Sequence, residues 1–118
     1  MSKFRVMVLK KNGKPVGVRA AALNGKIISI ALTDENPSNW HEAVKKGVPS
    51  LAEWLAILEN KEAVNKALKR AGGTPLKGWY WSSSEYVSHY AWIVNANNGD
   101  VTSNDKSHYG KYVRCVLA

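Results

Sequence analysis

The sequence predicts an α+β fold in which two helices pack on antiparallel strands and long, strand-anchored loops fill the C-terminal half. Three observations predict this fold. Strand-forming runs separated by Asn-Gly pairs occupy the first third, helix-start signals precede an apolar stripe in the middle, and strand-forming runs return near the end. A length of 118 residues suits one domain, 1–118, which we divide into a scaffold over 1–78 and a C-terminal region over 79–118.

The first third predicts a meander of three short strands. Runs rich in strand-forming residues cover 4–9, 16–20 and 26–32. The pairs Asn12-Gly13 and Asn24-Gly25 separate these runs, and Asn-Gly favours the tight turn that joins antiparallel neighbours.

The middle of the chain predicts helices. The cluster 36–39 is a helix-start signal, and the helix that follows should be short and end at Gly47. A stronger start lies at Ser50, because Ser50 and Glu53 have the spacing of a reciprocal capping box. An apolar stripe follows at helical spacing, and a further helical segment should continue to the Gly-Gly-Thr-Pro stop at 72–75.

Strand-forming runs return near the C-terminus. Residues 92–96 alternate as a strand does, 97–100 form a hairpin turn, and 101–106 should return alongside. The run 112–117 should be a closing strand that brings the two termini into one sheet.

Composition excludes several classes of protein. Hydrophobic residues make up 45% and charged residues 22%, which is typical of a folded domain. No apolar run approaches the roughly 20 residues that span a bilayer, and charge begins too early for a signal peptide. The single cysteine, Cys115, lies in an apolar run, so we expect a buried structural thiol rather than a nucleophile.

The net charge of +8 is confined to one part of the chain. Residues 1–78 hold 14 Lys and Arg against 6 Asp and Glu, whereas residues 79–118 hold three of each. Because the basic residues occur as singles and pairs, we interpret them as a solvated face. A nucleic-acid-binding module that uses this basic part is the alternative.

The last third has the composition of a recognition surface. Residues 79–112 hold three of the five Trp and all five Tyr, together with many Ser and Asn. Antibody-like surfaces use such a mixture, because Tyr and Trp supply rigid contact area and small polar residues supply hydrogen bonds. Ordinary polar loops would explain the Ser and Asn but not so many rings.

These residues also resemble a known family. The matching segments are Trp79–Tyr86, Ala91-Trp92, Val94-Asn95, Asn98-Gly99 and Tyr112–Arg114, and the resemblance extends over 49–118. They are similar to the C-terminal signature of C-type-lectin-fold variable proteins of diversity-generating retroelements, which are related to bacterial and phage lectin-like and formylglycine-generating-enzyme-like domains. The resemblance implies a C-type-lectin-like fold.

In that family, a fixed scaffold carries surface positions that error-prone reverse transcription rewrites. The resemblance implies that 79–118 is the variable ligand-binding region, with a protein or a surface glycan as partner. The implied ligand-binding positions are Val87, His89, Tyr90, Ile93, Asp100, Thr102, Ser103, Asp105, Ser107, His108, Tyr109 and Gly110. All of these residue types can be reached from an Asn codon by changing its two adenines. The implied setting is a phage virion or a bacterial surface-associated assembly, and an oligomer is possible.

We expect these variable side chains to point outward from a stiff frame. Trp81, Trp92 and Val113 should build the frame, and a pair formed by Glu85 and Arg114 should hold it beneath the loops. An undiversified structural or assembly domain of the same fold is a further alternative.

The sequence gives less support to the hypotheses of a catalytic site or a metal site than to that of a binding surface. His89 and His108 have no third metal ligand at a convincing spacing, and the sequence lacks the motifs of calcium-dependent sugar binding. A Ser-His-Asp set drawn from 82–84, His89 and Asp100 lacks a nucleophile elbow. We therefore expect a binding protein that is not an enzyme and that uses neither a cofactor nor a metal.

Overall fold

The computed structural model describes residues 4–117 and contains two β-sheets and three helices. The first sheet is an antiparallel meander of β1 (Met7–Lys11), β2 (Lys14–Leu23) and β3 (Lys26–Ala31), as predicted. Both connecting turns have the positive φ angles that Asn-Gly accommodates: 53° and 77° at Asn12-Gly13, and 51° and 78° at Asn24-Gly25.

The helices are α1 (Trp40–Lys46), α2 (Leu51–Glu59) and α3 (Lys61–Arg70), so the segment before the Gly-Gly stop is a third helix of its own. The Asn39 side chain caps α1, which ends at Gly47 with φ of 89°. The predicted capping box at Ser50 and Glu53 is present at the start of α2.

The second sheet has five strands in the order β4-β8-β5-β6-β7. These are β4 (Glu35–Ser38), β5 (Trp79–Val87), β6 (Tyr90–Asn95), β7 (Val101–Asp105) and β8 (Lys111–Val113). All pairs are antiparallel except β5 with β8. The sequence did not predict β4 or β5, and the expected long loops of the C-terminal half are short connections between strands.

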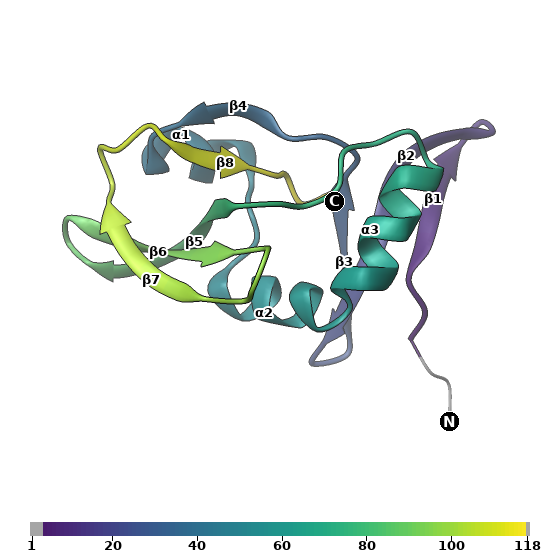
Figure 1. Ribbon diagram of the computed structural model, residues 1–118, viewed down its shortest axis with the longest axis horizontal. Coiled ribbons are helices and arrows are strands. Elements are labelled where there is room, and N and C mark those ends of the chain that lie inside the picture. The colour runs from purple at the N-terminus through teal and green to yellow at the C-terminus, as the bar shows by residue number, and fades with distance from the viewer. Residues whose placement is uncertain (1–3, 118) are drawn as a thin grey trace.

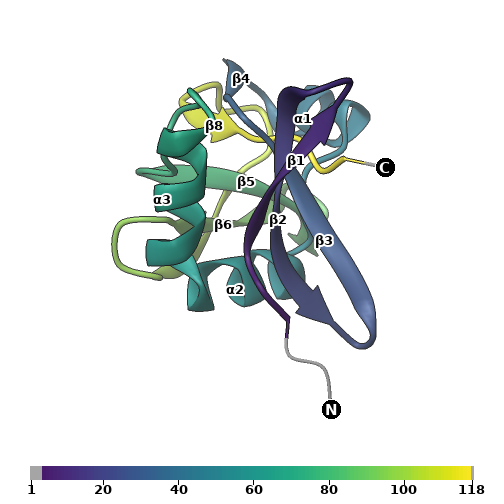
Figure 2. The same cartoon turned by 90° about the vertical axis from the view of Figure 1, so that its right-hand side faces the viewer.

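The two sheets lie at opposite ends of the longest axis, with α2 between them (Figure 1) and α3 against the first sheet (Figure 2). Trp54 of α2 is fully buried at this junction. Its indole N–H donates to the carbonyl of Trp81 at 3.1 Å, and its ring packs on Tyr80 at 4.9 Å between centroids.

Both faces of the five-stranded sheet are covered along its centre. Tyr80 and Val94 are paired across β5 and β6 and face the larger core, which α2, α3 and the first sheet complete. Trp81 and Ile93 are the next pair and face a second core against α1. The neighbouring pairs thus point to opposite faces, as the pleat of a sheet requires.

The C-terminal segment ties the two sheets together. Ile30 and Val116 form an antiparallel bridge, and the N–H of Leu117 donates to the carbonyl of Ser29 at 2.9 Å. The end of the described chain therefore contacts one edge of the first sheet, whose opposite edge is the early strand β1.

The predicted closing strand over 112–117 is shorter than expected, because β8 covers only Lys111–Val113 and belongs to the second sheet. The expectation that the two ends of the chain share one sheet is therefore wrong, and within residues 4–117 only the isolated Ile30–Val116 bridge joins the C-terminal segment to the first sheet.

Across residues 4–117, every helix falls short of the length and apolar character that crossing a bilayer requires.

Candidate ligand-binding surface

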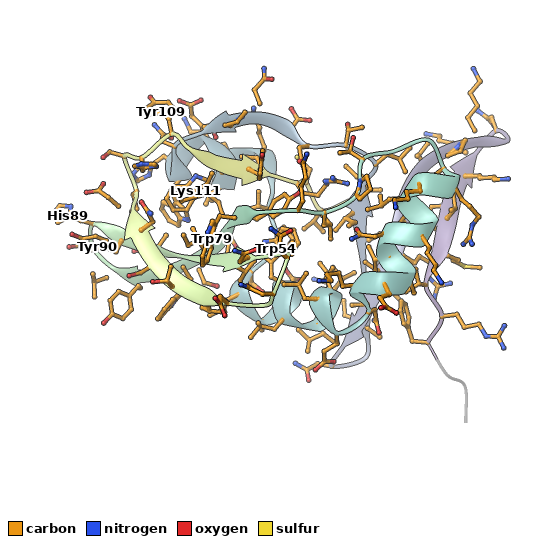
Figure 3. All side chains as sticks on the ribbon, in the orientation of Figure 1. Trp54, Trp79, His89, Tyr90, Tyr109 and Lys111 are labelled. Atoms are coloured by element: carbon orange, nitrogen blue, oxygen red, sulfur yellow. The ribbon has the colours of Figure 1, made fainter. Side chains whose placement is uncertain are left out.

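A cluster of exposed rings lies where β5 turns into β6 and where β7 ends. We call residues 86–90, 105 and 107–110 the rim; it excludes the buried Lys106. These ten residues hold four of the nine large hydrophobic side chains exposed in the described chain: Tyr86, Val87, Tyr90 and Tyr109. Figure 3 shows His89 and Tyr90 at the tip of the molecule, with Tyr109 above them.

The structure brings most of the predicted ligand-binding residues together in the rim. Strand pairing places Val87 opposite Tyr90, and Tyr90 opposite Asp105. The members that gather here are Val87, His89, Tyr90, Asp105, Ser107, His108, Tyr109 and Gly110, and all of them are exposed.

Three other predicted positions lie along the edge strand rather than in the rim. Asp100 lies just before β7, at the opposite end of that strand from Asp105. Thr102 is exposed on β7, whereas Ser103 is half-buried opposite Trp92. These positions extend the candidate surface along β7.

The expected exposure of Ile93 is wrong. Ile93 is 2% exposed and packs in the second core with Trp81 and Ala91. The strand alternation correctly predicted that Ile93 and Trp92 point to opposite faces of the sheet. The face on which Ile93 lies, however, is covered by α1 and is not exposed to water. Trp92, expected in the frame, is half-buried and packs on Tyr86 at 4.7 Å between ring centroids.

Lys106 holds the two halves of the rim together from beneath. Its ammonium group donates to the carbonyl of Ser88 at 2.8 Å and to the Glu85 carboxylate at 3.0 Å, and it lies 4.5 Å from the centre of the Trp40 ring. Its backbone N–H donates to the carbonyl of His89 at 2.9 Å. One buried cation thus joins the β5–β6 turn, the end of β7 and helix α1.

The segment after β7 is ordered by its own hydrogen bonds. The Asp105 carboxylate accepts from the hydroxyl and the N–H of Ser107, at 2.7 and 2.8 Å. These bonds stabilise the charged form and lower the pKa of Asp105 below its ordinary value. The Asn39 side chain donates to the Tyr109 hydroxyl at 3.3 Å, which links the segment to the cap of α1.

The serines after Trp81 connect β5 to its neighbours. Ser82 is fully buried, and its hydroxyl donates to the carbonyl of Trp92 at 2.7 Å. The Ser84 hydroxyl accepts the N–H of Leu51 at 2.9 Å, which satisfies a free amide at the start of α2. The indole N–H of Trp40 donates to the Ser82 carbonyl at 2.8 Å. This serine run is therefore part of the frame.

Arg114 does not pair with Glu85, as the sequence had led us to expect. The Arg114 side chain is fully buried, and its Nε donates to Asp34 at 2.7 Å, while Glu85 pairs with Lys106. The other guanidinium nitrogens donate to the carbonyls of Ala31 at 3.0 Å and Thr74 at 2.7 Å. This network ties the residue after β8 to the end of β3 and to the segment that follows α3, instead of supporting the rim.

The Asp34 carboxylate also accepts a hydrogen bond from the buried side chain of Tyr80. The Tyr80 hydroxyl donates to Asp34 at 3.1 Å. Burial, and then the charge of Asp34, raise the pKa of Tyr80 well above its ordinary value, so this phenol stays neutral.

The single cysteine, Cys115, is half-buried, whereas the sequence predicted a buried thiol. Its partial burial raises the pKa of the thiol, which disfavours the reactive thiolate.

A shallow polar hollow of about 370 Å³ lies beside the rim. His41 and His89 line it, and His108 is close by on the segment after Asp105, so the chain's three histidines gather here. Within residues 4–117, no group of three or more His, Cys, Asp or Glu side chains has the arrangement of a metal site.

The sequence did not reveal three contributors to this surface. Tyr86 is 54% exposed, but the strand that carries it was not predicted. His41 projects from α1, and no local pattern shows that this helix starts beside the rim. The anchoring role of Lys106 requires four partners distant in sequence, which no spacing rule could have found.

No protein-family model matches the chain, and the curated proteins contain no match to it.

Proposed function

We propose that this protein is a ligand-binding module with a C-type-lectin-like scaffold, whose rim binds a protein or a surface glycan. The observation that carries the proposal is the concentration of exposed apolar side chains: fewer than a tenth of the described residues hold four of the nine exposed large hydrophobic side chains, three of which are tyrosines. Clustered exposed apolar groups mark interaction sites, whereas scattered ones do not.

The support beneath the rim favours recognition over a passive surface. Lys106, the Asp105–Ser107 bonds and the Asn39–Tyr109 bond fix its backbone before any ligand arrives. A surface that is already ordered loses less conformational entropy on binding, so more of its contact energy appears as affinity. Tyrosine suits such a surface because it combines apolar area with a hydrogen-bonding group.

We further propose that the rim is diversified. Its side chains point away from the core, so they can be exchanged without disturbing the packing of Trp81, Ile93 and Val113. A retroelement would require a reverse-transcriptase gene nearby and a near-copy of the coding segment for 85–114. Absence of both from the neighbouring DNA would leave an undiversified binding or assembly domain.

A display library tests the binding proposal without a known ligand. Val87, His89, Tyr90, Ser107, His108 and Tyr109 are randomised together, and the library is selected against lysozyme as an arbitrary protein target. We expect folded binders. A matched library at Ala91, Ile93, Val94 and Val113, which are all buried, should yield few folded members. Failure of the rim library to yield binders while its members remain folded would contradict the proposal.

A further inference from the structure

Two segments of the chain lack any acidic residue, and the first packs against the helical part of the second at the far end of the molecule from the rim. Residues 4–33 and 63–84 contain no Asp or Glu and carry ten Lys and Arg between them. The first segment forms the three-stranded sheet, and the second includes most of α3, which packs on β1 and β2 (Figure 2). Folding therefore concentrates charge that the sequence shows only as singles and pairs.

These cations are not neutralised within the protein. Among residues 4–117, the ion pairs involve Lys46, Lys106 and Arg114, all outside the two segments. Lys11 and Lys14 are direct partners across the β1–β2 hairpin. Two like charges at facing positions of a strand pair destabilise it, so an external anion would relieve a cost that the fold leaves uncompensated.

The charge borders a groove. A hollow of about 390 Å³ lies between the β1–β2 hairpin and the end of α3, with Lys10 and Pro15 on one side and Arg70 and Ala71 on the other. Val6, Met7 and Val8 complete its lining, so Lys10 and Arg70 supply its charge. Lys69 precedes Arg70 in α3, and Lys11 and Lys14 follow Lys10 toward the tip of the hairpin, outside the lining of the hollow. No aromatic ring lines the groove, so it offers contacts to phosphates but no platform for stacking bases.

We propose that this groove, the basic groove, binds the phosphate backbone of a nucleic-acid strand independently of its sequence. A narrow polyanion can lie between the two charged sides of the groove, whereas the flat surface of an anionic bilayer would reach only the outer edges of these sides. The interaction is electrostatic, driven by release of the counterions that neutralise the phosphates. It is separate from the rim and does not depend on the rim's function.

The test uses a fluorescein-labelled single-stranded DNA of 20 mixed-sequence nucleotides and fluorescence anisotropy between 50 and 200 mM NaCl. We expect the full chain to bind, with affinity falling steeply as salt rises. The variant Lys10→Gln/Arg70→Gln should bind at least fivefold more weakly. Its slope of log affinity against log salt should be shallower by about 1.4, at roughly 0.7 per phosphate contact in single strands.

The control is Lys26→Gln/Lys45→Gln, which removes the same charge from exposed positions away from the groove. It should change affinity less than twofold, and circular dichroism should show all variants folded. Equal losses of DNA affinity in both variants would show an effect of net charge alone and would overturn the proposed role of the groove. Lack of DNA binding at 50 mM salt, or tighter binding to phosphatidylserine vesicles than to DNA, would also overturn it.

Discussion

The strands β5 and β6 have one end in the core and the other in water. At the inner ends, Trp81 and Ile93 are 0% and 2% exposed, whereas Val87 and Tyr90 at the outer ends are 48% and 44% exposed. The same two strands therefore supply part of the buried frame and part of the exposed rim that we propose binds a ligand. The contrast teaches that strand position along the sheet, and not residue type, decides which apolar side chains are available to a ligand.

The largest loss of folding stability should come from a substitution in the buried frame. Replacing Arg114→Met leaves the Asp34 carboxylate without its cation, and removing one partner of a buried pair costs about 3–5 kcal/mol. Urea denaturation measures the free energy of unfolding. The exposed pair of Lys46 and Glu35 is the control, because Lys46→Met should cost less than about 1 kcal/mol. Similar losses in the two variants would show that the Arg114 network is unimportant.

The next effect separates the two ends of β6. Ile93→Ala should destabilise by about 2–5 kcal/mol because it leaves a cavity between the sheet and α1. Tyr90→Ala, three residues earlier on the same strand, should change stability by about 0.5 kcal/mol or less. Thermal and urea unfolding of both variants check this, and equal effects would remove the distinction between frame and rim.

Replacing Lys106 should have an intermediate effect on stability, because this buried side chain supports the rim and not the hydrophobic core. Lys106→Met removes its bonds to Glu85 and the Ser88 carbonyl, and we expect a loss of about 1.5–3 kcal/mol. Faster hydrogen exchange at the amide of His108 should accompany it. Lys45→Met on α1 is the matched control. Unchanged exchange in the Lys106 variant would mean that the rim is ordered without it.

The smallest expected effect is a change in the pKa of the Asp105 carboxylate. Hydrogen bonds from Ser107 stabilise the charged carboxylate of Asp105, so its pKa is lowered. The stabilisation is present at neutral pH and is lost as acid protonates this group below the ordinary range of aspartate. NMR titration should show an upward shift of the Asp105 midpoint in Ser107→Ala. A shift in the opposite direction would contradict the assignment.

Local signals predicted much of the fold. The Asn-Gly turns, the Asn39 cap and the Ser50–Glu53 box depend on neighbours within a few residues, so the sequence shows them directly. The strand β5 was missed because its serines resemble a loop. Their hydroxyls bond to Trp92 and Leu51, and the register shifts after Trp81, features that depend on distant segments.

The candidate surface could be predicted only in part. Composition identified the segment, and most of its predicted residues are exposed, yet exposure along a strand depends on what covers each face. Ile93 is buried because α1, about fifty residues away in sequence, lies on that side. Likewise, the basic groove exists because α3 returns against the hairpin, a contact that no charge pattern along the chain reveals.

The central claim is that rim side chains can be exchanged while the frame stays intact. Urea unfolding of a variant with Val87, Tyr90 and Tyr109 all replaced by Ser tests it most directly. We predict one cooperative transition and a free energy of unfolding within about 1.5 kcal/mol of the parent protein, since exposed positions contribute little each. A loss as large as that of Ile93→Ala, or a broadened transition, would contradict the claim.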